Sequence, residues 1–266
     1  MFGPFQLATL GTGPWAHRFE KRRAWIDELP WHDTGSLRAR DTVAARHVWT
    51  QTAFSEYASA AAFAEIAAAL LRANAPIDLV AAAGDFVVDE ILHAEVAGRI
   101  ANALGGAVPM EVDLDRLVRP PTGSSALLRA AELVVRTSCI GETLTVPILK
   151  LGRELAGSPL IEAALRQVVG DESHHAQLGW WFLDWADDSL SDADRAHLTT
   201  VATETIRAFS PILGGACSES GLGVVACDRY DGAFAQALTN HVLAPLAERG
   251  IIVPSDVLTR APDPAR

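Results

Sequence analysis

The sequence contains one short pattern twice: Asp, Glu, two variable residues and His. The first copy, DEILH, occupies residues 89–93, and the second, DESHH, occupies residues 171–175. In an α-helix, residues i and i+3 lie on the same face, so each copy projects a carboxylate and an imidazole in one direction. Burying two such pairs is costly unless something compensates their charge, and this requirement restricts the fold strongly.

Apolar periodicity predicts that both copies lie on long helices. Asp41 and Asp78 are candidate N-caps for the first and second helices, and Gly105-Gly106 is a C-terminal signal for the second. Ser158-Pro159 matches the N-cap and first helical position of a fourth helix. The expected helices cover residues 42–74, 79–104, 124–156 and 158 to beyond 185, followed by 191–209 and 228–248.

The segments between these helices divide the chain. Residues 106–123 are rich in proline and predict a non-helical crossover long enough to span a bundle. No alternating strand pattern is evident. Pro147 has no N–H for the carbonyl of Thr143, so we expect a kink or bulge between Gly141 and Pro147. We therefore expect an N-terminal arm (1–40), a helical bundle (41–188) and C-terminal helices packed on it (189–266), forming a single domain.

Two further glutamates lie at matching distances upstream of the repeated pattern. Glu56 precedes Glu90 by 34 residues, and Glu142 precedes Glu172 by 30. In antiparallel hairpins of long helices, these separations return the chain to the same height. Glu65 is a competing acid on the first helix, but its 25 residues of separation from Glu90 are too few. Four carboxylates and two imidazoles can thus converge at mid-bundle.

The neighbours of these acids are small and apolar, which predicts that the carboxylates are buried. Four buried ionised carboxylates would repel one another, at a cost of several kcal/mol for each unpaired ion. Two divalent cations would balance the four negative charges and leave one imidazole for each metal. The sequence therefore predicts a site for two metal ions.

This arrangement over residues 42–186 resembles the ferritin-like di-iron carboxylate proteins. The resemblance implies an all-α fold, a ferritin-like four-helix bundle with a long crossover between helices 2 and 3, here extended by an N-terminal arm and two extra C-terminal helices. It implies that Asp89 orients the histidine of the second motif and that Asp171 orients that of the first. The implied ligands of the two iron ions are Glu56 and Glu142 as terminal carboxylates, Glu90 and Glu172 as bridging carboxylates, and His93 and His175 as nitrogen ligands.

The resemblance also implies chemistry with O2. The leading expectation is a non-haem di-iron oxidase or oxygenase that oxidises a small organic substrate, in the company of arylamine N-oxygenases, demethoxyubiquinone hydroxylases and tRNA hydroxylases. Val168 stands where arylamine N-oxygenases carry an additional histidine. The alternatives are a di-manganese catalase or peroxidase-like enzyme and a non-catalytic ferritin-like metal-binding protein. The substrate is not specified by the sequence.

Two residues one turn from Glu142 are candidates for a role beside the metals. Cys139 precedes it and Thr145 follows it, and a hydroxyl near the centre resembles the threonine of bacterial multicomponent hydroxylases, although it lies three residues after the Glu instead of four. The alternative interpretation is that Thr145 bonds the carbonyl behind it and that Cys139 is an ordinary core residue.

Composition limits the partners. The net charge of −11 argues against a nucleic-acid surface. No run of about twenty uninterrupted apolar residues or signal peptide is evident, so we expect no membrane association and a cytoplasmic location. Cys217 and Cys227 are expected to be free thiols. The chain has no dinucleotide fingerprint or iron–sulfur cysteine cluster, so electrons would come from an external donor. The oligomeric state is left open, with a homodimer among the alternatives.

Overall fold

The chain is all-α, with one very small sheet. The computed structural model describes residues 2–33, 39–209, 221–223, 227–254 and 257. Its longer helices are α3 (Ala39–Arg72), α4 (Ile77–Ala103), α7 (Pro159–Ala186) and α8 (Asp192–Phe209). The shorter helical segments are α1 (Gly13–Arg22), α2 (Ala24–Asp27), η1 (Leu114–Arg116), α5 (Ala126–Val134), η2 (Val135–Glu142), α6 (Thr143–Glu154), η3 (Asp187–Ser189), α9 (Cys227–Ala237), η5 (Leu238–Leu243) and α10 (Ala244–Glu248).

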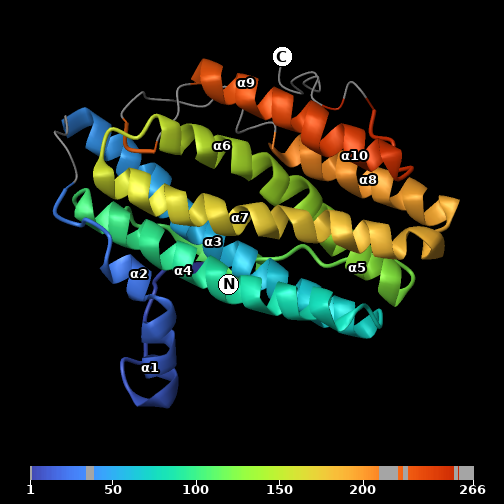
Figure 1. Ribbon diagram of the computed structural model, residues 1–266, viewed down its shortest axis with the longest axis horizontal. Helices are drawn as coiled ribbons and strands as arrows, with labels where there is room; N and C mark the ends of the chain where they lie inside the picture. Colours follow the sequence, from blue (N-terminus) through green and yellow to red (C-terminus); the bar gives the residue numbers. More distant parts are fainter. Residues whose placement is uncertain (1, 34–38, 210–220, 224–226, 255–256, 258–266) are drawn as a thin grey trace.

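Four long helical rods pack together and contain both repeats (Figure 1). Helices α3 and α4 form one hairpin, and the continuous rod α5–η2–α6 packs against α7 as a second pair. Gly105 and Gly106 follow α4 with φ of 116° and 107°, a left-handed conformation that glycine adopts without strain. The C-terminal signal predicted there is confirmed.

The helix starts differ slightly from the sequence prediction. Helix α3 begins at Ala39, two residues before Asp41, and the N-cap of α4 is Pro76. Asp78 instead lies in the first turn of α4, where its Oδ1 accepts a hydrogen bond from the backbone N–H of Leu79 at 3.1 Å. The N-cap at Ser158 and the first-turn proline of α7 are confirmed.

The rod that carries Glu142 contains the irregularity that the sequence predicted, but at another place. Residues Val135–Glu142 form a π-helix, and both the backbone N–H and the hydroxyl of Thr143 bond to the carbonyl of Ser138, five residues back. Pro147 lies inside the regular helix α6. The bulge therefore precedes Pro147 and ends at Glu142, and π-bulges of this kind are frequent at functional sites.

The crossover contains the only extended pairing in the described part of the chain. Strand β1 (Phe2–Pro4) pairs antiparallel with β2 (Glu111–Asp113). Neither segment alternates polar and apolar residues over enough positions to be recognised, so the sequence did not predict them. The pairing ties the N-terminal arm to the crossover beside α3, where Phe5 packs edge-on against Phe54 and Tyr57.

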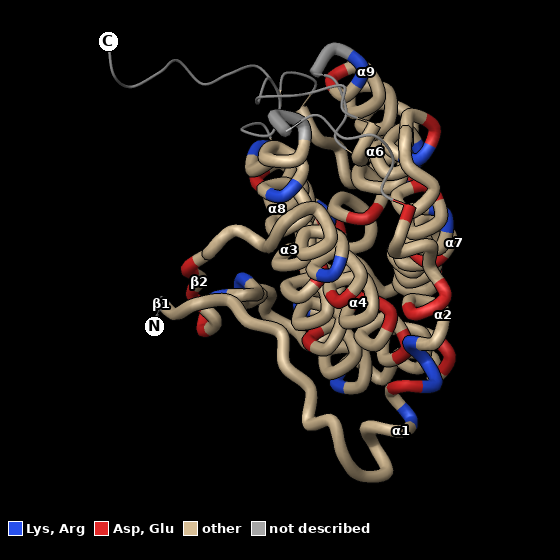
Figure 2. The backbone as a smooth tube through the Cα atoms, turned by 90° about the vertical axis from the view of Figure 1, so that its left-hand side faces the viewer, with Lys and Arg blue, Asp and Glu red and all other residues tan. Residues whose placement is uncertain are grey.

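The rest of the N-terminal arm contains two short helices. Helix α1 has no buried residue and projects from the bundle in both views (Figures 1 and 2). At its end, Arg22 lies 3.5 Å from Asp89 on α4, and Arg99 of α4 donates a hydrogen bond to Asp27 at 2.6 Å. Ile26 of α2 is completely buried. The arm is thus attached to the bundle by ion pairs and by apolar contacts, with Ile26 the most deeply buried.

The C-terminal helices contribute to the main hydrophobic core. Leu198 and Ile206 of α8, and Phe234 and Val242 of the α9–η5 segment, are completely or almost completely buried in the same cluster as the bundle helices. Residues 42–72 of α3 are long and apolar enough to pass a composition test for a membrane span, with a mean hydropathy of 1.2. Because α3 packs along α4, its position as a bundle helix accounts for this composition.

Candidate metal centre

The six residues that the sequence predicted as metal ligands come together in the middle of the bundle. All four rods contribute residues to this cluster. Helix α3 carries Glu56, the π-helix η2 ends at Glu142, and α4 and α7 each carry one Glu and one His. The ligand atoms form two groups of four, each with all atoms within 4.8 Å of one another. The first group is Glu56, Glu90, His93 and Glu172, and the second is Glu90, Glu142, Glu172 and His175.

The two groups share Glu90 and Glu172, and this sharing defines the geometry of the centre. A carboxylate that belongs to both groups can place one oxygen at each position, which is how a bridging ligand binds two ions. Glu56 and Glu142 each belong to one group, as terminal ligands would. The arrangement therefore has room for two neighbouring ions.

The centre is removed from water on most sides. Glu90, Glu172 and both histidines are at most 1% exposed, and Glu142 is 6% exposed. Glu56 is partly exposed as a residue, although its carboxylate faces the cluster. Phe63 and Phe86 pack against His175 with ring centroids 5.2 and 4.3 Å away. These rings cover the His175 side of the centre with apolar surface.

Each imidazole is held between a carboxylate outside the centre and carboxylates inside it. His93 Nε2 lies 3.2 Å from Asp171 Oδ2, and its Nδ1 lies 3.0 Å from Glu172 Oε1. An acid at Nε2 favours the tautomer with its proton there, which leaves the Nδ1 lone pair facing inward.

The second histidine has a similar but looser arrangement, because its Nε2 makes no hydrogen bond to the described residues. His175 Nε2 lies 3.6 Å from Asp89 Oδ2, and Nδ1 lies 3.0 Å from Glu90 Oε1 and 3.2 Å from Glu172 Oε2. The contacts cross between the motifs as the resemblance implied: the Asp of each motif contacts the His of the other.

The carboxylates of the centre have strongly perturbed pKa values. Burial, with the charge of Glu172, raises the pKa of Glu56 to about 7 and raises the pKa values of Glu90 and Glu142 well above the ordinary range. Burial alone would also raise the pKa of Glu172, but hydrogen bonds with His175 and then His93 lower it below its usual value. Without metal, the protein therefore neutralises much of the cluster with protons.

The histidines show the opposite balance. Burial by itself would lower their pKa values, but the neighbouring carboxylates outweigh it. Asp171 and Glu172 raise the pKa of His93 well above its ordinary value, and Asp89 and Glu172 raise that of His175 to about 10. The centre is therefore a place that stabilises positive charge.

The donor atoms fit a pair of divalent cations. Among the described residues, both carboxylate oxygens of Glu90 and Nε2 of His175 are buried without a well-aligned hydrogen bond, although His175 Nδ1 lies 3.0 Å from Glu90 Oε1. Such atoms are costly to bury unless something binds them. Four carboxylates and two imidazoles offer oxygen and nitrogen ligands that suit Fe, Mn or Zn, and they do not by themselves decide between these metals.

The residues predicted to lie beside the centre have ordinary structural contacts. The Thr145 hydroxyl donates to the carbonyl of Gly141 at 2.9 Å, which is the backbone-bonding alternative. Cys139 is completely buried in the main core, where burial raises the pKa of its thiol far above normal. It packs against Gly179 of α7. A role for either residue in catalysis remains a prediction. Glu65, the competing acid on α3, is exposed.

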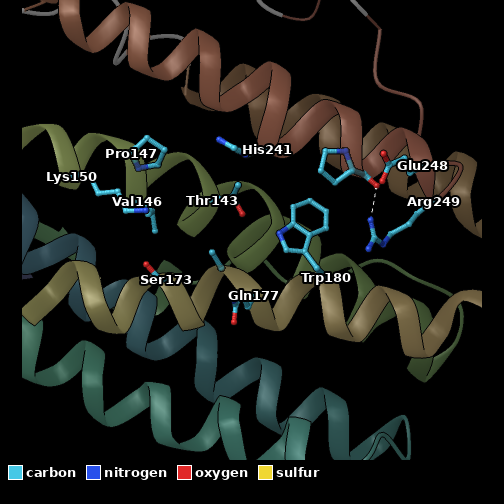
Figure 3. A pocket seen from close by; sticks show the side chains of 12 residues that line it. Thr143, Val146, Pro147, Lys150, Ser173, Gln177, Trp180, His241, Glu248 and Arg249 are labelled. Atoms are coloured by element: carbon cyan, nitrogen blue, oxygen red, sulfur yellow. Dashed lines mark hydrogen bonds between the residues drawn. The ribbon is translucent and has the colours of Figure 1, made fainter.

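Sequence reasoning did not identify a cleft beside α6 and α7 (Figure 3). Its lining includes the hydroxyl residue Thr143, next to Glu142, and a cation and an aromatic side chain, Lys150 and Trp180. No local signal could have identified the cleft, because its third wall comes from residues 241–249. Cys217 and the side chain of Cys227 lie outside the described residues.

Comparisons with known proteins add no assignment. A scan against protein-family models, a search of curated proteins and a search of solved structures each found no match to the chain. The function of the centre therefore has to be inferred from its residues and their geometry.

Proposed function

We propose that the protein is a ferritin-like di-iron oxidase or oxygenase that uses O2 to oxidise a small organic substrate. The observation that carries the proposal is the pair of four-residue groups that share Glu90 and Glu172. Shared carboxylates hold two ions close enough to act on one O2 molecule. A structural metal site would need only one set of ligands.

The residues of the chain have distinct roles in this proposal. Glu90 and Glu172 would be shared by the two ions, while Glu56 with His93 and Glu142 with His175 would complete one position each. Two bound iron ions would supply the electrons that reduce O2, and an external donor would restore them. Glu90 makes no well-aligned hydrogen bond among the described residues, which would leave its oxygens available to two ions.

The second contribution of the protein is the environment of the centre. Asp171 orients the imidazole of His93 through a hydrogen bond at Nε2, and Asp89 lies 3.6 Å from Nε2 of His175, where it would play the same part at a longer distance. Phe63 and Phe86 keep bulk water from His175, which protects a reactive centre from side reactions. The π-helix ends at Glu142 and sets the position of that ligand on its rod.

The test begins with metal content, measured by mass spectrometry on protein purified without chelator. The protein is then reduced anaerobically and mixed with O2 while its visible spectrum is recorded. About two iron ions per chain and a transient visible band would support the proposal. Two manganese ions would favour peroxide disposal. A stable metal content without any reaction with O2 or peroxide would make the site structural, and no bound metal after loading would refute the proposal.

A further inference from the structure

The cleft beside the metal centre has the size of a small-molecule site. Its volume is about 500 Å³, within the range of common ligand pockets. Figure 3 shows it bounded by α6, α7 and the C-terminal segment that contains η5 and α10. Charged, polar and apolar side chains line this cleft together.

The cleft lies against the segments that hold three of the six ligands. Its lining residues Thr143, Ser173 and Ala176 are each the next residue after a ligand: Glu142, Glu172 and His175. Successive helix residues point about 100° apart, so the ligands face the bundle interior while these neighbours face the cleft. Thr143 and Ala176 are buried and have small side chains. They form the thin part of the wall between the cleft and the centre.

The two ends of the cleft carry opposite charges. Figure 3 shows Lys150 at one end and Glu248 at the other. Thr143 lies between the two ends in Figure 3, and it is seven residues from Lys150 on α6, which corresponds to about 10 Å along the helix axis. Among the described residues, neither Lys150 nor Glu248 has a side-chain ion pair or hydrogen bond. Both charged groups are therefore available to a ligand.

The neighbouring Arg249 is in a different situation and does not provide a free cation. Its guanidinium bonds to Asp184 at 2.6 and 2.8 Å, donates to the carbonyl of Pro245 at 2.9 Å and lies over the ring of Trp180 at 5.4 Å. The net charge at the Glu248 end of the cleft is therefore negative, because Asp184 already balances the positive charge of Arg249.

The middle of the cleft combines apolar side chains with the polar residues Thr143, Ser173, Gln177 and His241. Val146 and Pro147 of α6 and the ring of Trp180 line it between the charged ends. A ligand that fits all three regions needs an acid group at one end, an apolar body and an ammonium group at the other. A purely anionic or purely cationic ligand would leave one charged end of the cleft without a partner.

We propose that this cleft binds a small zwitterion of the ω-amino acid class, with its carboxylate at Lys150, its apolar body against Pro147 and Trp180, and its ammonium at Glu248. The proposal deepens the proposed function, because such a compound would be the substrate class of the adjacent centre. Its binding, however, requires only the cleft.

The experiment measures binding to the protein as purified, by titration calorimetry at low ionic strength. The probes are 6-aminohexanoate, hexanoate, hexylamine and glycine. We expect 6-aminohexanoate to bind about two- to fivefold more tightly than either singly charged compound, since each end adds the contribution of one exposed ion pair. Glycine has both charges but cannot reach both ends, so it should bind no better than hexanoate.

Three variants assign the ends. Lys150→Met should weaken 6-aminohexanoate and hexanoate and leave hexylamine unchanged, whereas Glu248→Gln should weaken 6-aminohexanoate and hexylamine and leave hexanoate unchanged. Glu154→Gln, an exposed acid one turn beyond Lys150 and outside the cleft lining, is the matched control and should change none of the affinities.

The outcomes separate this proposal from the proposed function. Equal affinities for the four probes, or unchanged binding in both cleft variants, would overturn the zwitterion site whatever the centre does with O2. Selective binding in a protein whose centre does not react with O2 would support the cleft and refute the oxidase or oxygenase function.

Discussion

Replacing Glu90 with leucine should stabilise the metal-free protein and remove its response to metal. Glu90 is completely buried, and neither of its carboxylate oxygens makes a well-aligned hydrogen bond to the described residues, although His175 Nδ1 lies 3.0 Å from Oε1. Its pKa is raised well above normal, first by burial and then by the charge of Glu172. In the metal-free protein it is therefore a buried neutral acid whose polar atoms are unsatisfied.

The magnitude follows from the cost of such a group. An unsatisfied buried polar group costs about 1–3 kcal/mol, and leucine of similar volume avoids that cost. For a chain of this size, the melting temperature of the metal-free variant should rise by about 2–10 °C. In the wild type, one metal ion at a free concentration of about 100 times its Kd adds about 2.7 kcal/mol. Because Glu90 belongs to both ligand groups, the variant should lose this gain at both positions.

The assay is calorimetric melting of wild type and variant, each after chelator treatment and after anaerobic loading with Fe(II). Glu65→Gln is the control, because Glu65 is an exposed acid on α3 outside both ligand groups. It should melt like wild type in both states. The reasoning is refuted if Glu90→Leu lowers the metal-free melting temperature, or if the variant keeps the wild-type gain on loading.

Three other sets of substitutions test the metal centre and the packing of the bundle. His93→Ala and His175→Ala should each retain about one metal ion per chain by mass spectrometry, because each histidine belongs to only one ligand group. Glu132→Gln should lower the free energy of unfolding at pH 7 by about 3 kcal/mol in urea titrations, since this buried carboxylate bonds to Thr122, Arg136 and His197. Gly179→Ala should lower it by about 1–3 kcal/mol, because the new Cβ would lie 2.5 Å from Cys139 Sγ.

The Glu132 variant also has a pH signature. Burial alone would raise the pKa of Glu132, but the hydrogen bonds from the Thr122 backbone and His197 lower it below the ordinary 4.5. Its contribution to stability is therefore present above pH 4.5 and is lost as the pH falls through the lower pKa of the folded state. A difference between wild type and variant that stays constant from pH 7 to about pH 3 would contradict this account.

The Gly179 and histidine substitutions can also be checked. Gly170→Ala, also on α7, meets no atom within 4 Å and should stabilise the protein by about 1 kcal/mol, the usual helix preference for alanine. If Gly179→Ala stabilises it equally, the contact with Cys139 is not close. If His93→Ala and His175→Ala both keep two ions, or both lose two, the division into two ligand groups fails.

Short-range sequence pattern was sufficient to identify the candidate ligands, because their spacing follows the periodicity of an α-helix. The i, i+3 spacing placed Glu90 with His93 and Glu172 with His175 before any tertiary information was used. The hairpin distances then selected Glu56 over Glu65, and the structure places Glu56 in the cluster and Glu65 at the surface. These inferences depend only on helix geometry and on connections of known length.

Features that depend on contacts distant in sequence were not predictable in this way. Pro147 marked an irregular rod, but the π-helix formed at 135–142, where Thr143 bonds back to Ser138 and Gly179 of α7 closely approaches Cys139. Likewise, Thr143 and not Thr145 lines the cleft, since that choice is fixed by the rotation that the π-helix gives to α6.

The sequence by itself determined the helical class, the four long rods and the identity of the clustered acids and histidines, because each follows from short-range periodicity and from the charge that buried carboxylates cannot carry alone. Only the tertiary structure decided which acid contacts which imidazole and where the chain forms a cleft. The wall formed by residues 241–249 lies beside α6 and α7 in space. In the sequence it follows Trp180 of α7 by about 60 residues or more. Such encounters are set by the packing of whole helices, and no local pattern encodes them.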